Sequence, residues 1–599
     1  MTNLYMKSKP YAITEDESLE DNTYLSYNAV IGTSVDAKLY LAFQILDYAL
    51  VMTPGAPVKQ ALLDAGISTD VYSSYETSLY QPVYSIVAKN SNSKEQDRFV
   101  SVINDTLEKL VKDGINERTI EAGINYYEFK YREADYGPYP KGLMYYLTMM
   151  DSWLYDETKP FIHIEAGDTF DELKKNARNG YFEKLIKEYL LDNNHKSIIS
   201  LVPEYGLEKE KEQKEADKLA EYKSTLTNDE LEELVKKTKE LKEYQDTPSS
   251  QEDLEKIPML ELSDIKREPA KDYNDVKSVD GIKIVHHNIF TNKIAYINMS
   301  FDTKCVPDEL IPYMGLLGST LSLMDTKNYT YPELTNEINI NCGGLATGTA
   351  LYSDKVDFSK NTIVYEVKSK ALYEKVPFVL GMMEEIMYNT RFDDYKRLKE
   401  IIARIKSRLE ASLMGQGHSI AMLECCAQFS ESAYYSDILR GYKYYEFIKK
   451  LDEEFEQNKT QIVDKLNKLV GYIFNKDNVI VSLTADDEGY DCFVKALSAK
   501  SCNIKDEHYN TAVRSFIPVN VKTGYTSASQ VQYVARCGNF VKDGYKYTGA
   551  LKVLKVIFSY DYLWINVRVK GGAYGCMSGS SRNGDFYMVS YRDPNLEKT

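Results

Sequence analysis

The sequence predicts an α+β protein that repeats one kind of domain, in which a mostly antiparallel sheet is covered by helices. Two blocks, each roughly 200 residues long, show the same order of strands and helices, and a third block begins that order again near the end of the chain. A charged segment with helical periodicity separates the first two blocks. A repeat of this length indicates a duplicated domain, because solenoid units are only about 20 to 50 residues long.

The first block occupies residues 1–203 and is expected to form one domain. Its alternating and helical hydrophobic patterns predict, in order, a strand at 23–32, a helix at 35–52, a short helix at 58–65, strands at 71–75 and 80–88, helices from about 94 to 191, and a closing strand at 197–202.

Residues 204–268 are dense in Lys and Glu and contain no glycine after Gly206. Thr227 and Glu230 have the spacing of a capping box, and Leu231, Leu234 and Val235 begin an apolar stripe at helical intervals. The segment therefore predicts a helical hairpin that links the first two blocks. Its charges indicate either a solvated face or a docking surface.

The second and third blocks repeat the order of the first. For 269–510 the patterns predict a strand at 294–301, helices at 308–324 and 331–340, strands at 345–352 and 362–367, helices from about 372 to 469 and a strand at 479–483; for 511–599 they predict a strand at 530–537, a helix at 547–564 and strands at 573–580 and 585–591. No long helices follow in the last block, and a bare sheet would expose an apolar face. We therefore expect that the domain at 511–599 is truncated and that the natural protein continues beyond Thr599.

Composition excludes several classes of function. With 73 Lys+Arg against 90 Asp+Glu, the net charge of −17 offers no basic surface for nucleic acid. The eight cysteines all follow residue 304 and form no CxxC, which favours a reducing compartment. The most apolar stretch, around 40–52, contains Gln44 and Asp47 and is too short for a membrane span. We expect a cytoplasmic protein without membrane contact, unless a targeting segment precedes this sequence.

The strings HExxH, HxxEH, GxSxG, GxxxxGK[ST] and GxGxxG are absent from the sequence. His286 and His287 are neighbours in a strand-like stretch, where successive side chains point to opposite faces and cannot easily share an ion. We therefore expect packing or surface roles for the six histidines, no metal site and no catalytic residue in this chain.

One local string stands out: Arg568-Val569-Lys570-Gly571-Gly572-Ala573-Tyr574-Gly575. Its glycines allow another backbone to approach closely, Arg568 offers a permanent cation with a fork of donors, and Tyr574 offers a phenolic donor. Together they could grip a peptide carbonyl. A tight turn with an incidental Arg and Tyr explains the string equally well, and a phosphate cradle is a weaker third interpretation.

This string, with the downstream stretches Asn583-Gly584-Asp585-Phe586 and Ser590-Tyr591-Arg592-Asp593-Pro594-Asn595, resembles the last domain of the pitrilysin/insulinase metallopeptidases, in the presequence protease and falcilysin-like branch. Residues 53–55, 61–66, 258–265 and Gly417-His418-Ser419 agree with it, so the resemblance runs from about residue 20 to the end.

The resemblance implies four homologous domains in two halves, joined by a hairpin and closed around a chamber that degrades unfolded oligopeptides. This chain would supply the second, third and part of the fourth domain, with Arg568, Tyr574, Gly571 and Gly572 binding substrate. The zinc of the complete family enzyme belongs to a first domain with an HxxEH motif that this sequence does not contain, so the chain alone is expected to be inactive. Its partners would be oligopeptides and the missing catalytic domain. The alternative is a non-catalytic pseudo-peptidase subunit or scaffold that pairs with a separate zinc-bearing chain.

Overall fold

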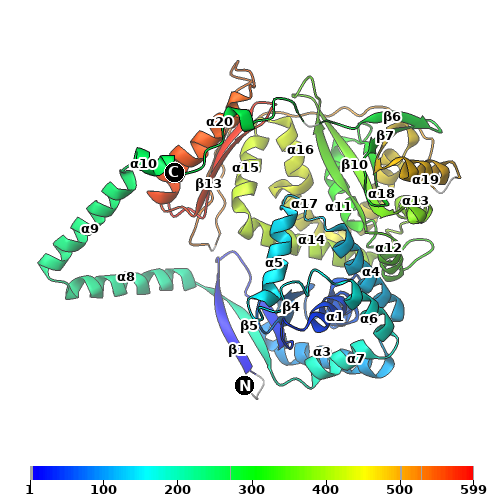
Figure 1. Ribbon diagram of the computed structural model, residues 1–599, viewed down its shortest axis with the longest axis horizontal. Coiled ribbons are helices and arrows are strands. Elements are labelled where there is room, and N and C mark those ends of the chain that lie inside the picture. The colour runs from blue at the N-terminus through cyan, green and yellow to red at the C-terminus, as the bar shows by residue number, and fades with distance from the viewer. Residues whose placement is uncertain (1–4, 270, 500–501, 528, 598–599) are drawn as a thin grey trace. The chain divides into compact units, whose positions relative to one another are not determined.

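The computed structural model describes residues 5–269, 271–499, 502–527 and 529–597. The chain forms two compact units (Figure 1). The large unit contains Glu15–Pro203 and Asn274–Thr523, and the small unit contains Glu204–Tyr273 and Gly524–Thr599.

The first sheet of the large unit has the strand order β1-β5-β2-β4-β3. The central strand β2 alternates buried and half-buried residues and pairs antiparallel with both β4 and β5. The strands are β1 (Tyr5–Ile13), β2 (Thr23–Val30), β3 (Asp70–Glu76), β4 (Val83–Ser91) and β5 (Lys196–Tyr205), and the helices are α1 (Ala37–Asp47), α2 (Pro57–Asp64), α3 (Gln96–Asp113), α4 (Glu117–Glu133), α5 (Lys141–Trp153), α6 (Gly167–Ala177) and α7 (Tyr181–Leu185).

Helix α1 is the apolar centre of this part of the unit. Asp36 caps it by accepting a hydrogen bond from the amide of Leu39 at 2.9 Å, and a π-helical turn, Tyr48–Met52, extends it. Among the described residues, Ala37–Asp64 is the one helical segment with the length and hydropathy of a membrane span, so the expected argument from shortness was wrong. Burial explains its composition instead, because 67% of its most apolar window is covered by the rest of the protein.

The second sheet has the order β6-β7-β11-β8-β10-β9 and is antiparallel except where β7 pairs with β11. In its register, Phe301 of β8 lies opposite Tyr365 of β10 and Val479 of β11, and these side chains pack with Leu316 and Ile402 of the covering helices. The strands are β6 (Asp275–Val279), β7 (Ile282–Asn288), β8 (Ile294–Asp302), β9 (Leu345–Ser353), β10 (Asn361–Leu372) and β11 (Val479–Ala485), and the helices are α11 (Ile311–Thr320), α12 (Tyr331–Asn341), α13 (Val376–Tyr388), α14 (Tyr395–Gly415), α15 (Gly417–Ala427), α16 (Glu431–Arg440), α17 (Tyr442–Glu453), α18 (Phe455–Ile473) and α19 (Asp487–Ser498).

Helices α4 and α12 join the two sheet layers within the large unit. Asn336 donates to the hydroxyl of Thr119 at 3.0 Å, and Asn339 donates to the hydroxyl of Tyr48 at 2.6 Å. Lys370 pairs with Glu133 at 2.5 Å, and both side chains are largely buried. Polar contacts with buried partners are directional, so they fix how the two layers meet.

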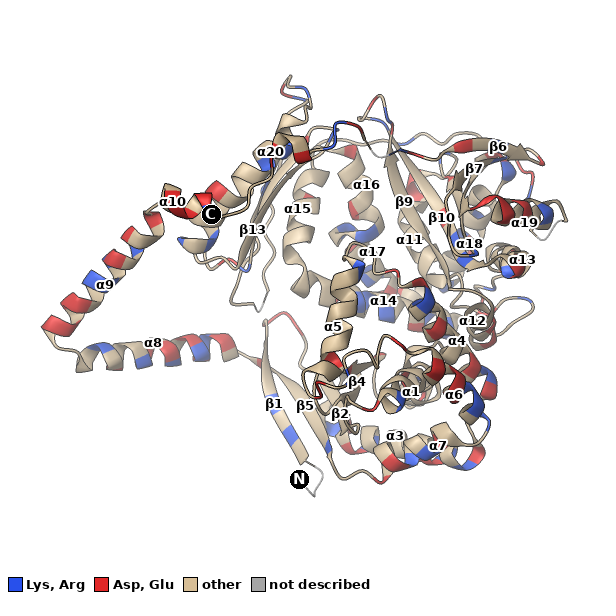
Figure 2. Cartoon of the chain, viewed as in Figure 1, with Lys and Arg blue, Asp and Glu red and all other residues tan. Residues whose placement is uncertain are grey.

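The small unit contains the predicted hairpin, α8 (Leu207–Thr225) and α9 (Asn228–Asp246), followed by the short α10 (Gln251–Glu255). None of these helices has a buried residue, and acidic and basic side chains alternate along them (Figure 2). The capping box is present, because Thr227 and Glu230 each accept from the other's backbone amide. The hairpin prediction is confirmed.

The rest of the small unit is an antiparallel sheet of order β12-β14-β13 with one long helical segment. These elements are β12 (Ala535–Asn539), α20 (Ala550–Ile557), its π-helical continuation Phe558–Val569, β13 (Gly575–Ser580) and β14 (Asp585–Tyr591).

The predicted α+β architecture with mostly antiparallel sheets is confirmed, but several elements differ. The strand expected at 530–537 forms only as β12, and the helix expected at 308–324 ends at Thr320 because Leu321 takes an extended backbone. The sequence patterns missed β1, β6 and α19.

Candidate functional site

The predicted substrate-binding residues lie on the turn between the π-helical segment Phe558–Val569 and β13. Gly572 has a φ of +84°, and its amide donates to the carbonyl of Arg568 at 2.9 Å. A Cβ added to Gly571 would lie 2.5 Å from the carbonyl oxygen of Val567. Both glycines are therefore required by the backbone itself, one by its dihedral angle and one by close contact. The tight turn is present, and a ligand-binding role for it stays a prediction.

The Arg568 side chain lies between two aromatic rings. Its guanidinium carbon is 3.8 Å from the ring centroid of Trp564 and 5.8 Å from that of Tyr574. Tyr574 is 66% exposed, while Arg568 is half-buried. Within the described part of the chain no carboxylate pairs with this guanidinium. Stacking on Trp564 holds the cation in one orientation and leaves its donors available to a ligand.

Neighbouring segments hold the turn in place. Asn595 donates to the carbonyl of Gly571 at 2.8 Å, and the amide of Tyr574 donates to the carbonyl of Arg592 at 3.2 Å. Lys570 forms an ion pair with Asp246 at the end of α9. Residues from three segments of the small unit therefore fix the backbone that carries Arg568 and Tyr574.

Cys576 follows the turn as the second residue of β13. Burial raises the pKa of its thiol, and the nearby charge of Arg568 opposes that shift without cancelling it. The thiol therefore stays protonated at neutral pH and does not supply a thiolate nucleophile beside Arg568.

Comparison with known proteins bears directly on this turn. The family model described as PreP C-terminal domain matches residues 524–599, and a second model, which describes a peptidase-associated domain, matches residues 201–451. Protein HypA of Clostridium perfringens is 40% identical over 598 residues, which cover 99% of this chain and 61% of that protein. Presequence protease 1, chloroplastic/mitochondrial, of Arabidopsis thaliana is 29% identical over 600 residues, 98% of this chain and 55% of that protein.

The chain belongs to the presequence-protease branch of the pitrilysin/insulinase peptidases. It spans 55% to 61% of the length of these two relatives. Among solved structures, pitrilysin aligns with a TM-score of 0.41 at 13% identity, over 95% of this chain and 57% of pitrilysin.

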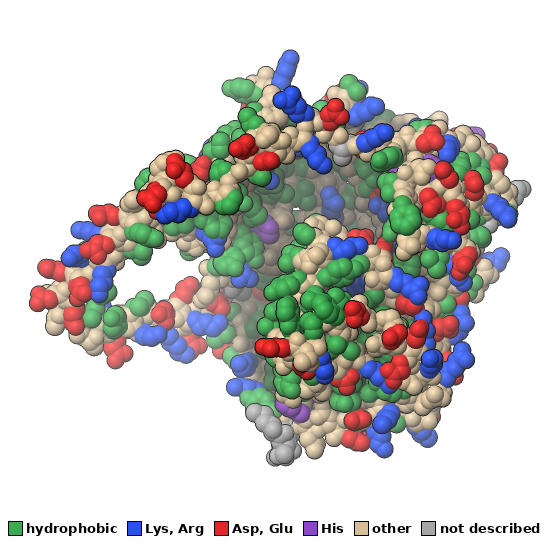
Figure 3. All heavy atoms as spheres, viewed as in Figure 1, with side chains coloured by type: hydrophobic (Ala, Val, Ile, Leu, Met, Phe, Trp, Pro, Cys, Tyr) green, Lys and Arg blue, Asp and Glu red, His purple; other side chains and the backbone are tan. Residues whose placement is uncertain are grey.

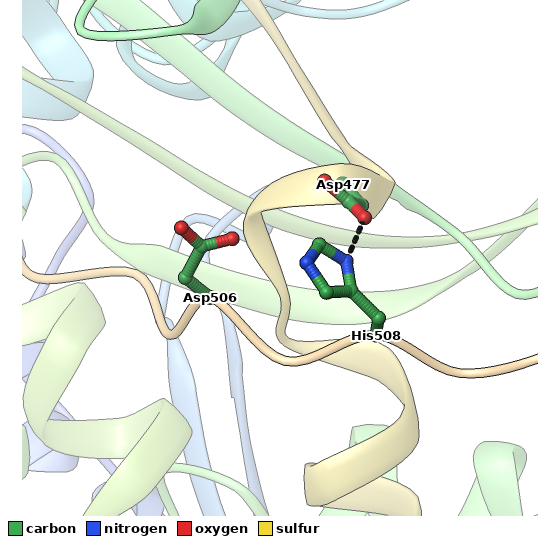
Figure 4. Close-up of side chains that lie close together, drawn as sticks. All are labelled: Asp477, Asp506 and His508. Carbon is green, nitrogen blue, oxygen red and sulfur yellow. Dashed lines mark hydrogen bonds and ion pairs between the residues drawn. The ribbon is translucent and has the colours of Figure 1, made fainter.

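A zinc site is expected in members of this peptidase family, and one group of candidate ligands is present in the large unit. Figure 4 shows Asp477, Asp506 and His508, whose nearest ligand atoms all lie within 4.8 Å of one another, with the Nδ1 of His508 bonded to Asp477. All three residues are exposed. The pair Asp506 and His508 is visible in the sequence, but only the fold adds Asp477.

These three residues do not fit the family's catalytic zinc. That ion needs the HxxEH histidines and a sheltered position with one site open to substrate, whereas this group has one histidine on an exposed loop whose Nδ1 is already engaged. Exposed acidic groups of this kind are common without an ion, so we assign no metal to it.

A second surface of this presequence-protease relative is apolar. Helix α5 has one buried residue, Ser152, and its Leu143, Tyr146 and Leu147 are 47% to 50% exposed. Figure 3 shows hydrophobic side chains gathered over this helix. Contiguous apolar patches mark surfaces that contact another molecule or segment.

Proposed function

We propose that this chain supplies the substrate-binding and chamber-forming domains of a zinc-dependent metalloendopeptidase that degrades unfolded oligopeptides. The observation that supports it best is the exposed turn at 568–575. There a guanidinium without a carboxylate partner among the described residues is held against Trp564, beside an exposed tyrosine. A stretch that matches the PreP C-terminal domain carries this turn.

In this proposal Arg568 and Tyr574 bind the peptide backbone. The guanidinium donates to a peptide carbonyl, the phenol donates to a second acceptor, and Gly571 and Gly572 leave room for an extended chain to approach. Zinc in the complete enzyme would polarise the scissile carbonyl and activate water. The described residues offer no ligand set for that ion, so this chain binds and orients the peptide and is inactive alone.

The same proposal divides the chain into four parts. Residues 1–203 and 269–510 are the second and third peptidase-like domains, 204–268 is the linker, and 511–599 is part of the fourth domain. We place the protein in the cytoplasm, with unfolded oligopeptides and the zinc-bearing first domain as its partners.

The second candidate function is a non-catalytic subunit or scaffold that pairs with a separate zinc-bearing chain. The exposed apolar face of α5 favours some covering partner, and both hypotheses supply one. Reading the coding region that precedes residue 1 separates the two. An HxxEH motif encoded upstream in the same frame supports the first, and a stop codon directly upstream supports the second.

A further inference from the structure

The large unit contains a cluster of cations that the proposed peptidase function does not use. Lys59 of α2 and Arg397 and Arg404 of α14 line one small cavity with the carboxylates of Asp70 and Glu400. Arg408 lies one turn beyond Arg404 on the same helix. The cavity therefore lies where α2 and β3 of the first sheet meet α14.

The carboxylates in this cluster are already engaged. Glu400 accepts from the Nη1 of Arg397 at 3.0 Å, and Asp70 accepts from the hydroxyl of Ser407 at 3.3 Å. Among the described residues, neither Lys59 nor Arg404 has a carboxylate oxygen within 4 Å. Three cations thus share a cavity with two carboxylates, and two of the cations have no direct ion pair within the described chain.

One donor in the cavity wall has no partner. Arg397 is 7% exposed, its Nε donates to the carbonyl of Leu323 at 3.0 Å and its plane stacks on Tyr331 at 4.0 Å. Its Nη2 is buried and, within the described residues, finds no acceptor. A buried donor without an acceptor costs about 1 to 3 kcal/mol, so a bound acceptor at this point is strongly favoured.

The electrostatics of the cluster agree with a missing negative charge. Burial, and then the charge of Arg404, lowers the pKa of Lys59 to about 8. Burial, and then the charge of Arg408, lowers the pKa of Arg404 to about 10. Both shifts are in the direction that a nearby anion would reverse.

The size of the cavity limits the ligand. Its volume is about 10 Å³, close to the least space that holds one water molecule. A tetrahedral oxyanion would require the surrounding side chains to move apart, whereas a monatomic ion needs little adjustment. We propose that this cavity binds one chloride ion between Lys59, Arg397 and Arg404, and that the ion joins the first sheet's α2 to α14.

The test measures the melting temperature of the purified chain as chloride replaces methanesulfonate at constant ionic strength. We expect chloride at about 100 times its dissociation constant to raise the melting temperature by about 3 °C. Arg404→Met should abolish this response and, in chloride-free buffer, melt no lower than the wild type, because it removes a repelled charge. Arg98→Met, at an exposed local ion pair on α3, is the matched control and should keep the wild-type response.

Three results would overturn the proposal: equal stabilisation by methanesulfonate and chloride, a stronger response to sulfate than to chloride, or an unchanged chloride response in Arg404→Met. If that variant does not fold, Lys59→Met replaces it with the same expectations. A crystal soaked in bromide gives an independent readout, because anomalous density should appear between Lys59, Arg397 and Arg404, and its absence contradicts the site.

Discussion

Replacing Arg568 tests the proposed peptide grip at its centre. Arg568→Met removes the cation and its donors but keeps a linear side chain that can still cover Trp564. Arg568→Lys keeps the charge but loses the planar fork and most of the stacking seen at 3.8 Å. The two variants therefore separate charge from geometry.

The structure sets the expected size of each effect. A hydrogen bond from a charged donor contributes about 1.5 to 3 kcal/mol, so Arg568→Met should weaken peptide binding by roughly 10- to 150-fold. An exposed cation–π contact contributes about 0.5 to 1 kcal/mol, so Arg568→Lys should lose about two- to fivefold. Wild type, Lys variant and Met variant are expected in that order of affinity.

The assay is fluorescence anisotropy of an unstructured, fluorescein-labelled peptide titrated with each purified variant. Arg536→Met is the matched control, since Arg536 is an exposed arginine on β12 of the same unit, outside the turn. Its affinity should equal that of the wild type. An Arg568→Met variant that binds as tightly as the wild type, or a control that weakens equally, refutes the assignment of Arg568.

Three further predictions concern backbone, capping and protonation. Gly572→Ala should lower the stability of the small unit by about 1 kcal/mol or more, because alanine is strained at a φ of +84°, while Gly575→Ala, whose added Cβ meets only ordinary contacts at 3.7 Å, should cost less; urea unfolding followed by Trp564 fluorescence compares them. Thr227→Ala should cost about 1 kcal/mol of local α9 stability and speed amide exchange at Glu230 about fivefold, whereas Thr238→Ala within the same helix should not speed it. Lys59 loses its proton near pH 8 in the folded chain but keeps it to about 10.5 when unfolded, so in chloride-free buffer stability should rise with pH across this window; urea midpoints on either side of it should converge in Lys59→Met, and an unchanged slope would contradict the assignment.

Long periodic elements were predictable because their patterns are set by one buried face. β2, α1 and β8 follow such patterns over eight or more residues and appear where expected. β1 was missed because Lys7, Lys9 and Pro10 make it polar, and it forms at the edge of a sheet, beside β5.

The turn between β6 and β7 shows a signal that was available in the sequence. Asp280 and Gly281 both have positive φ, of 51° and 82°, and join antiparallel strands as a two-residue hairpin. An Asp-Gly pair between alternating residues is typical of this hairpin. Local chemistry of this kind can be found without the fold.

The candidate sites divide in the same way. The turn at Gly571 and Gly572 is local, so its conformation could be predicted from two adjacent glycines. The cation cluster is not local, because Lys59 and Arg404 lie in separate blocks of the sequence and only the packing of α2 against α14 brings them together. No spacing rule within either segment indicates that contact.

The most direct test of the account is to incubate the purified chain with zinc and a quenched fluorescent peptide, with and without a chelator, while anisotropy monitors binding of the same peptide. The account predicts that the peptide binds through Arg568 and that fluorescence from cleavage does not rise. Cleavage that the chelator abolishes would contradict it.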